Sequence, residues 1–312
     1  MRPCGDTSGR RNVVDIVTPY LRCPVCRQPL AAGAAGTARA LRCPRGHSFD
    51  LARQGYVNLV AGRVAHAGDT AQMVADRDAF LSAGHYDFVS GALAAAAADA
   101  VATVDGDPTA PGDRPAGPLV VDAGAGTGRH LAAVLDAVPG AVGLALDVSK
   151  PAVRRAARAH PRAAAALADS WGTLPVADGA AAVLFNVFAP RNGAEFRRVL
   201  RPDGALLVVT PADDHLAELV DRLDLLRVDP AKADRVAGSL ADHFQLAERS
   251  THRRTLPLDR VQVRTLVGMG PSAWHTDGRG LDARIAGLAE PVEVTASVVL
   301  GRYRPRGRAA RA

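Results

Sequence analysis

The 312-residue sequence contains no apolar run of about eighteen residues, the length that a membrane-spanning helix needs, although 48% of its residues are hydrophobic. This absence excludes a chain that crosses a bilayer by helices, and we expect no membrane partner. The first fifteen residues, MRPCGDTSGRRNVVD, also lack the continuous apolar segment of a secretory signal, which predicts a cytoplasmic protein. Cysteine is scarce, and in a cytoplasmic chain the four cysteines predict thiols or metal ligands instead of disulfides.

Lysine is almost missing, because Lys150 and Lys232 are the only two and all other cationic side chains except histidine are arginine. Residues 1–65 contain ten arginines and three aspartates, a net charge of +7, so the other 247 residues sum to −1 in a chain of net charge +6. A G+C-rich coding sequence can account for arginine over lysine, but not for this segregation of charge. A basic front end on a near-neutral body is typical of a protein whose front end binds a polyanion.

Composition divides the chain into five parts. Residues 1–20 show little periodicity and predict a flexible tail, whereas residues 21–60 are rich in Cys, Pro, Gly and Arg and too poor in large apolar residues to form a core of their own. Residues 61–117 predict a helical connector that ends in a Pro- and Gly-rich linker. Residues 118–302 alternate apolar strand-like runs with helical stretches, which predicts an α/β domain with a parallel sheet and an antiparallel pair at one edge. Residues 303–312 form a basic tail.

Two pairs of potential metal ligands lie in the second part. Cys23 and Cys26 form a C-x2-C pair, and Cys43 and His47 form a C-x3-H pair sixteen residues later. Three thiolates and one imidazole are a ligand set that tetrahedral Zn²⁺ prefers, and four protein ligands leave no open position, so we predict a structural zinc. A single pair would more often be a buried thiol or a surface histidine. We expect loss of the metal to unfold this module and to leave the rest of the chain folded.

A glycine-rich turn follows the first strand of the α/β domain. The segment VVDAGAGTG places Asp122 before Gly124, Gly126 and Gly128, and a helix is expected from Arg129. Glycines let the backbone approach a ligand at the carboxyl end of a parallel strand. The dinucleotide fingerprint G-x-G-x-x-G would need glycine at the position of Arg129, which disfavours NAD.

The D-x-G-x-G-x-G form resembles the first motif of class I (Rossmann-like) S-adenosylmethionine-dependent methyltransferases, in which the acid and the glycine backbone surround the methionine end of the cofactor. Asp147 ends the second strand nineteen residues after Gly128, where that family places an acid on the ribose hydroxyls. Asp169 ends the third strand, where a side chain usually contacts the adenine amino group. Either aspartate alone would more often be a helix cap or a turn residue.

The longer motifs resemble the 23S rRNA guanine-N1 methyltransferases, especially the branch that gives macrolide producers tylosin-type resistance. The matching stretches include CPVCRQPL, CPRGHSFDLARQGYVNL, GDTAQMVADRDAFLSAGHY, LALDVSKPAV, TPADDHLAEL and MGPSAW, and they cover residues 21–302. The resemblance implies a methyltransferase sheet with an N-terminal Cys3His zinc-binding module. It also implies that cofactor contacts come from Tyr86, Gly126, Thr127, Gly128, His130, Leu131 and His215.

Some positions depart from that pattern. Thr127 stands where many relatives have Glu, and Asn186 stands where others carry a different polar residue, so neither is assigned a catalytic role. Tyr86 could instead be a core aromatic and His215 a helix-terminal side chain. The sequence does not identify the general base, so the catalytic residue is unknown.

The resemblance implies methylation of guanine N1 in a 23S rRNA hairpin that lines the peptide exit tunnel, with macrolide resistance as the consequence. Only 4% of the residues are aromatic; Trp171, Phe188 and Trp274 are candidate base-stacking residues, although each is more typical of packing. One alternative is a small-molecule methyltransferase acting on a macrolide or its sugar, which would not need a basic zinc module. Another is a non-catalytic RNA-binding protein, which the intact cofactor motif disfavours. The guanine, the state of the rRNA substrate and a homodimer are left open.

Overall fold

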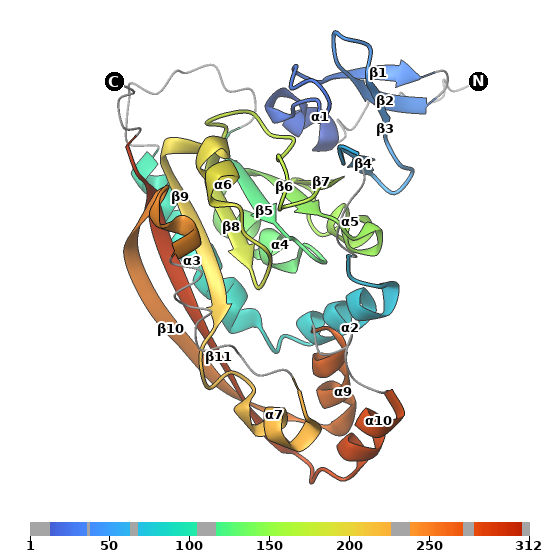
Figure 1. Ribbon diagram of the computed structural model, residues 1–312, viewed down its shortest axis with the longest axis vertical. Coiled ribbons are helices and arrows are strands. Elements are labelled where there is room, and N and C mark those ends of the chain that lie inside the picture. Colours follow the sequence, from blue (N-terminus) through green and yellow to red (C-terminus); the bar gives the residue numbers. More distant parts are fainter. Residues whose placement is uncertain are drawn as a thin grey trace, which may run out of the picture.

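The computed structural model describes residues 13–35, 38–62, 68–104, 117–225, 238–270 and 278–307 (Figure 1). An eight-stranded sheet runs through the body. Its strands in spatial order are β10 (Phe244–Leu258), β11 (Val292–Pro305), β9 (Leu200–Pro211), β8 (Ala181–Val187), β5 (Leu119–Ala123), β6 (Val142–Asp147), β7 (Ala163–Leu167) and β4 (Tyr56–Asn58). No described helix is both long enough and apolar enough to cross a membrane.

The centre of this sheet is parallel, and its order is doubly wound. Strands β5 and β7 are buried at every position, which their continuously apolar sequences require because helices or other elements cover both faces. Strand β10 pairs antiparallel with β11, and β11 pairs antiparallel with β9, so this pair forms one edge of the sheet. The predicted α/β fold with a parallel sheet and an antiparallel pair at one edge is therefore confirmed.

Two hydrophobic clusters lie on the two faces of the sheet, as strand alternation requires. Val120 belongs to one cluster and Val121 to the other. The first face is covered by α3 (Asp87–Val104), α4 (Arg129–Ala137) and α5 (Lys150–Ala156). The second face is covered by α6 (Gly193–Val199), by the N-terminal helix α1 (Val13–Val17) and by the zinc-binding module.

A group of helices lies below the parallel strands in Figure 1, beside the lower parts of β10 and β11. It consists of α2 (Ala71–Ser82), α7 (Ala217–Leu223), α9 (Arg260–Gly268) and α10 (Gly278–Ala286). Helix α2 begins at the N-cap Thr70, whose side chain accepts a hydrogen bond from the backbone N–H of Met73. Apolar side chains of α7, α9 and α10 join the first cluster, so this group is continuous with the body.

The N-terminal module is a small antiparallel sheet of β1 (Ala31–Ala35), β2 (Ala38–Arg42) and β3 (Ser48–Asp50). The next strand, β4, leaves this sheet and pairs in parallel with β7 of the main sheet. The module is therefore joined to the body through backbone hydrogen bonds as well as through its apolar side chains.

Two of the predicted boundaries need correction. The flexible tail predicted over residues 1–20 is wrong for residues 13–20, which form α1 and the 3-10 helix η1 (Thr18–Tyr20) with Val14 and Val17 buried. A five-residue helix carries too little periodicity to be recognised and is stabilised here by packing. At the other end, β11 continues through Pro305, three residues into the predicted basic tail. Residues 1–12 and 308–312 lie outside the described chain.

Candidate functional site

The glycine turn joins the carboxyl end of β5 to the first residue of α4. Gly124, Gly126 and Gly128 have φ values of 88°, 55° and 79°, in the left-handed region that L side chains rarely adopt. A Cβ on Gly128 would lie 3.0 Å from Cα of Ala156, so glycine also lets α4 approach α5. The local sequence is therefore explained by backbone conformation and close packing before any ligand is considered.

Asp147, at the end of β6, holds this turn in place. Its Oδ2 accepts a hydrogen bond from the Gly126 N–H at 2.8 Å, and its Oδ1 accepts one from the Ser149 N–H at 2.8 Å. Burial raises the pKa of Asp147, and these two donors offset part of that rise. A carboxylate has about four acceptor directions, so two remain for the hydroxyls of a ligand.

Three buried oxygen acceptors around the turn have no hydrogen-bond donor among the described residues. They are Asp122 Oδ2, Thr127 Oγ1 and Asn186 Oδ1, from β5, the turn and β8. The amide of Asn186 is oriented by its Nδ2, which donates to the carbonyl of Ala123 at 2.7 Å. Burial and the neighbouring Asp147 raise the pKa of Asp122. Unpaired buried acceptors are costly, and donors such as the ammonium group at the methionine end of S-adenosylmethionine would satisfy them, so this structure fits the cofactor.

Tyr86 and His215 lie 129 residues apart in the sequence and meet in the structure. His215 Nδ1 accepts a hydrogen bond from the Ser297 N–H at 3.1 Å, so the neutral ring carries its proton on Nε2, which lies 3.4 Å from the Tyr86 hydroxyl. The ring of Phe188 lies beside both, with centroids 5.8 Å from His215 and 6.5 Å from Tyr86. Burial raises the pKa of Tyr86, so its hydroxyl stays neutral and can donate a hydrogen bond.

His130 and Leu131, the second and third residues of α4, point into the body. The Nδ1 of His130 lies 2.9 Å from the Ser90 hydroxyl on α3, and burial, with Arg77 nearby, lowers the pKa of His130 to about 4. The side chain of Leu131 lies against Gly143 of β6. Because both side chains face the core, any contact of this segment with a cofactor would come from its backbone.

Asp169 lies two residues beyond β7, at the same edge of the sheet as Asp147, because β6 and β7 pair in parallel with Asp147 opposite Leu167. Its Oδ1 accepts a hydrogen bond from the backbone N–H of Trp171 at 2.9 Å. Asp169 therefore closes an Asx turn, and its second oxygen is the atom that could meet an adenine amino group.

Sequence reasoning missed Arg77 on α2. Its guanidinium pairs with Asp69 and donates to the carbonyl of Met269 at 2.7 Å. A Cβ on Gly126 would lie 3.2 Å from Arg77 Nη1, so this side chain lies directly over the turn. The Ser149 hydroxyl donates to the carbonyl of Asp69 at 2.8 Å. Only the stretch GDTAQMVADRDAF hinted at this contact, because spacing cannot show that α2 folds over the cofactor turn.

The four predicted zinc ligands converge in the N-terminal module, where Cys23 and Cys43 are buried. Their ligand atoms all lie within 4.8 Å of one another. Sγ of Cys26 lies 3.6 Å from Sγ of Cys43, and Nδ1 of His47 lies 3.3 Å from Cys43 and 3.6 Å from Cys23. A tetrahedral zinc with bonds of about 2.3 Å to sulfur separates its ligands by about 3.8 Å, so the set is close to the geometry required. Burial opposes ionisation, but hydrogen bonds with His47 lower the pKa of Cys43 to about 6, which favours the metal-binding thiolate.

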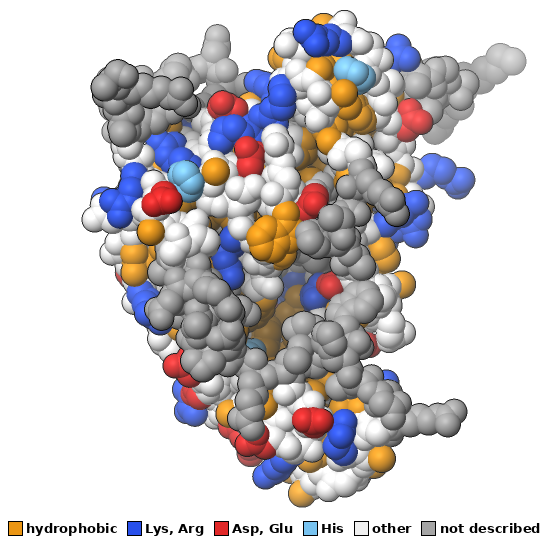
Figure 2. Space-filling view, in the orientation of Figure 1, with side chains coloured by type: hydrophobic (Ala, Val, Ile, Leu, Met, Phe, Trp, Pro, Cys, Tyr) orange, Lys and Arg blue, Asp and Glu red, His pale blue; other side chains and the backbone are white. Residues whose placement is uncertain are grey.

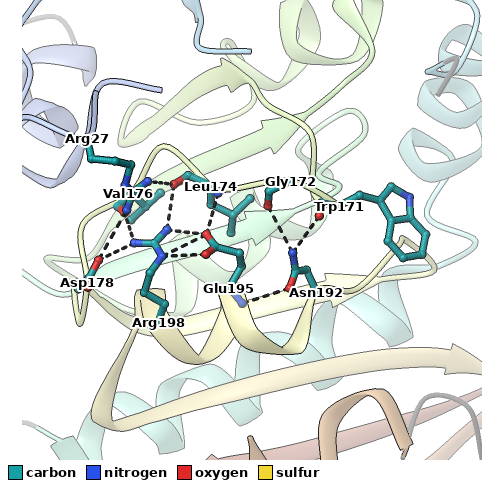
Figure 3. A network of polar contacts seen from close by, with 9 residues as sticks. All are labelled: Arg27, Trp171, Gly172, Leu174, Val176, Asp178, Asn192, Glu195 and Arg198. Atoms are coloured by element: carbon teal, nitrogen blue, oxygen red, sulfur yellow. Dashed lines mark hydrogen bonds and ion pairs between the residues drawn. The ribbon is translucent and has the colours of Figure 1, made fainter. Parts of the chain in front are cut away.

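Arg27 joins the module to the body, and Arg198 of the body holds the same segment from the other side (Figure 3). Arg27, with φ of 65° next to Cys26, donates to the carbonyls of Leu174 at 2.8 Å and Val176 at 3.3 Å. Arg198 of α6 donates to the same two carbonyls at 3.0 Å and 2.7 Å. Burial lowers the pKa of Arg27, and the charge of Arg198 adds to that effect. The segment that precedes β8 is thus held from both sides.

Comparison with known proteins adds to this geometry. Residues 21–62 match the family model described as "RlmA, N-terminal", a zinc ribbon. A Micromonospora griseorubida protein named "Putative 23S rRNA (guanine-N(1)-)-methyltransferase" is 70% identical over 292 residues, 92% of this chain and 98% of that protein. A Streptomyces fradiae protein named "23S rRNA (guanine(748)-N(1))-methyltransferase" is 52% identical over 296 residues, 95% of this chain and 99% of that protein. Among solved structures, "Complex between the Haloferax volcanii Trm112 methyltransferase activator and the putative methyltransferase" has 20% identity and a TM-score of 0.44, and it covers 76% of this chain and 98% of that one.

Proposed function

Because this chain belongs to the 23S rRNA (guanine-N1)-methyltransferase family, we propose that it methylates guanine N1 in a 23S rRNA hairpin. Two relatives show the family, since they are 70% and 52% identical to this chain over more than nine tenths of its length. The whole-length match to the Streptomyces fradiae protein is the observation that carries the proposal. The resemblance stated from the motifs is confirmed at the level of the family. The enzyme uses S-adenosylmethionine and holds a structural zinc ion.

Within this proposal, Cys23, Cys26, Cys43 and His47 are the zinc ligands. The cofactor contacts are those predicted from the sequence, supported by the unpaired acceptors of Asp122, Thr127 and Asn186 and by the remaining acceptor directions of Asp147. Asn186 is an addition to the predicted set.

The basic N-terminal module is the expected RNA-binding surface. Arg42 and Arg45 are exposed and form no ion pair with a described residue, whereas Arg39 is neutralised by Asp15 at 2.6 Å. Figure 2 shows Lys and Arg side chains spread over the upper part of this face, across the module and beside it. Exposed arginines bind the phosphates of an RNA whatever its nucleotide sequence, so they would hold the hairpin while the glycine turn fixes the position of the cofactor.

Methyl transfer requires the protein mainly to position the substrate and to exclude water from the site. When bound, S-adenosylmethionine supplies an electrophilic methyl group on a sulfonium with an excellent leaving group. Guanine N1 must lose its proton, and a site that orients the base and excludes water supplies much of the rate. The buried Tyr86 is a neutral donor that suits positioning of a ligand. The His130 ring, neutral above its pKa of about 4, faces the core beside Ser90 and supports the turn from behind. We assign no general base.

The test is reverse transcription across 23S rRNA treated with enzyme and cofactor, because a methyl group at N1 blocks the Watson–Crick edge and stops the polymerase. We expect one new stop at a guanine. Methyl transfer to a free macrolide or its sugar, without a stop on rRNA, would establish the small-molecule alternative instead.

Three further parts of the proposal concern its setting. A methyl group on a hairpin that lines the exit tunnel would reduce macrolide binding, so expression in a sensitive host should raise the inhibitory concentration of tylosin-type drugs. We expect the enzyme to act in the cytoplasm, where ribosomes are assembled. Size-exclusion chromatography decides whether it acts as a homodimer.

A further inference from the structure

Trp171 lies on the segment between β7 and β8 and exposes 54% of its surface. We infer that its indole stacks against an unpaired base of the substrate RNA. The backbone that carries the indole is held by a hydrogen-bonded network, here called the clamp, which consists of Asn192, Glu195, Arg198 and Arg27 and which also binds the zinc module through Arg27. The inference rests on the proposed function, because it names a contact of the same RNA substrate.

The place of Trp171 in the fold is the first argument. It comes four residues after β7, at the edge of the sheet where the parallel strands end. Strand β6 lies between β7 and β5, the strand that leads into the glycine turn, and Asp147 at the end of β6 binds that turn directly. A base stacked on Trp171 would therefore lie on the same edge as the cofactor turn, where the target nucleotide has to arrive.

The backbone on each side of the indole is fixed. The Trp171 N–H donates to Asp169 Oδ1 at 2.9 Å, and Asn192 Nδ2 donates to the carbonyl of Trp171 at 2.9 Å and to that of Gly172 at 3.4 Å. Asn192 is itself the N-cap of α6, because its Oδ1 accepts from the Glu195 N–H at 3.2 Å. Figure 3 shows the indole at one end of this network, pointing away from it.

The clamp continues to the zinc module. Glu195 accepts from the Leu174 N–H at 2.9 Å, and Arg198 holds Glu195 at 2.6 Å. The carbonyl of Leu174 accepts from both Arg198 and Arg27, the residue that follows the zinc ligand Cys26. A movement of the segment 23–27, which carries the zinc ligands Cys23 and Cys26, would therefore be transmitted through Arg27 to the segment that carries Trp171.

This combination indicates a partner that arrives from solvent. A tryptophan that serves packing would be buried, yet more than half of this one is exposed on a backbone that is held rigid. A rigid aromatic ring loses little entropy when a base stacks on it, and every base offers a π-face. The arginine-rich module at the far end of the clamp favours RNA as that partner over the adenine of the cofactor.

Fluorescence can test this directly, since the chain contains only two tryptophans, Trp171 and Trp274. In the Trp274→Phe variant, all tryptophan emission comes from Trp171. We expect a 23S rRNA hairpin fragment to quench that emission strongly, and S-adenosylhomocysteine alone to leave it nearly unchanged. In Trp171→Ala, RNA affinity should fall about 5- to 100-fold, whereas Trp171→Phe should stay within about 5-fold of the wild type.

The possible results separate the inference from the proposed function. Unchanged Trp171 emission in a variant that still binds RNA by filter binding overturns the inference and leaves the methyltransferase proposal standing. Quenching by S-adenosylhomocysteine in the absence of RNA assigns the indole to the cofactor and also overturns it. If the wild-type enzyme neither binds nor methylates rRNA, the proposed function has failed and the inference falls with it.

Discussion

Gly126 occupies a backbone conformation that few other residues adopt, and it lies against the guanidinium of Arg77. Gly126→Val should therefore combine backbone strain of about 1–2 kcal/mol with a side chain in the path of the cofactor. Gly140, with φ of 80° and open space around its missing Cβ, is a matched control at the other edge of the sheet. We expect both valine variants to lose stability in urea unfolding through backbone strain, Gly126→Val somewhat more because its side chain meets Arg77, and calorimetry to show reduced cofactor affinity in Gly126→Val alone. Equal cofactor affinity in the two variants would place the cofactor elsewhere.

His130 gives the protein a specific dependence of stability on pH. Its pKa falls from about 6.5 in the unfolded chain to about 4 in the folded one, so the unfolded chain binds its proton first as pH falls. The stability that the neutral ring contributes is thus complete above about pH 6.5 and is lost between about pH 6.5 and 4. The raised pKa values of Asp122 and Asp147 act in the opposite direction, so a variant is needed to isolate the histidine.

The isolating variant is His130→Asn, which keeps a hydrogen-bonding partner for Ser90. Between pH 7 and pH 5 the wild type should lose about 2 kcal/mol more unfolding free energy than the variant, because only the wild type carries the histidine. Urea unfolding at the two pH values measures it. A difference that does not change with pH would mean that the His130 ring has the same pKa in the folded protein as in the unfolded chain, and a change of opposite sign would mean that folding raises its pKa.

Sequence reasoning found the residues whose role follows from local spacing and missed those defined by contact. The strand–glycine–helix segment predicts Asp122 and the turn, and the end of the next strand predicts Asp147. Only the family resemblance singles out Tyr86 and His215 as cofactor contacts, and nothing in the sequence indicates that these two residues, 129 positions apart, meet. Arg77 and Arg27 act through backbone carbonyls on other elements, and no periodicity or motif reports such a contact.

At the scale of elements, the zinc module is less independent than its composition suggests. Its last strand, β4, belongs to the main sheet, and Leu21 and Val57 are buried in the same cluster as Val121 of β5. Short elements such as α1 and β4 have no sequence signal of their own, because partners far along the chain stabilise them. The alternation of long apolar strands with helices, in contrast, predicted the central sheet and its antiparallel edge.

This continuity changes the expected result of removing the metal. Cys43→Ser should lose the roughly one equivalent of zinc and lower the melting temperature of the whole protein in a single transition, because the module and the sheet share a core. Cys4→Ser is the control, as Cys4 lies outside the ligand set and should keep zinc. Calorimetric scans of both variants measure the effect. A separate methyltransferase transition at the wild-type temperature would show that the module unfolds alone, as composition by itself suggested.

The junction between module and body depends on Arg27. Arg27→Ala removes the donors to two carbonyls, and we expect a loss of about 1–3 kcal/mol in unfolding free energy. Arg22→Ala is the matched control in the same knuckle, because its guanidinium bonds only to the nearby carbonyls of Pro19 and Leu21 among the described partners. Urea unfolding should separate the two variants by at least about 1 kcal/mol. Equal losses would mean that the junction is held by its apolar contacts alone.

At the scale of the whole molecule, the positive charge of the N-terminal module determines how RNA binding responds to salt. Each phosphate contact releases counterions, so the logarithm of affinity falls with the logarithm of salt concentration by about 0.7–0.9 per contact. Arg42 and Arg45 are exposed and form no ion pair with a described residue, and replacing both with alanine should reduce that slope by up to about two. Arg39→Ala should reduce it less, because Asp15 already neutralises Arg39. Filter binding of a 23S rRNA hairpin between about 50 and 200 mM salt measures the slopes, because the affinity of such complexes changes steeply over this range. An unchanged slope in the double variant would move the RNA-binding surface away from the zinc module.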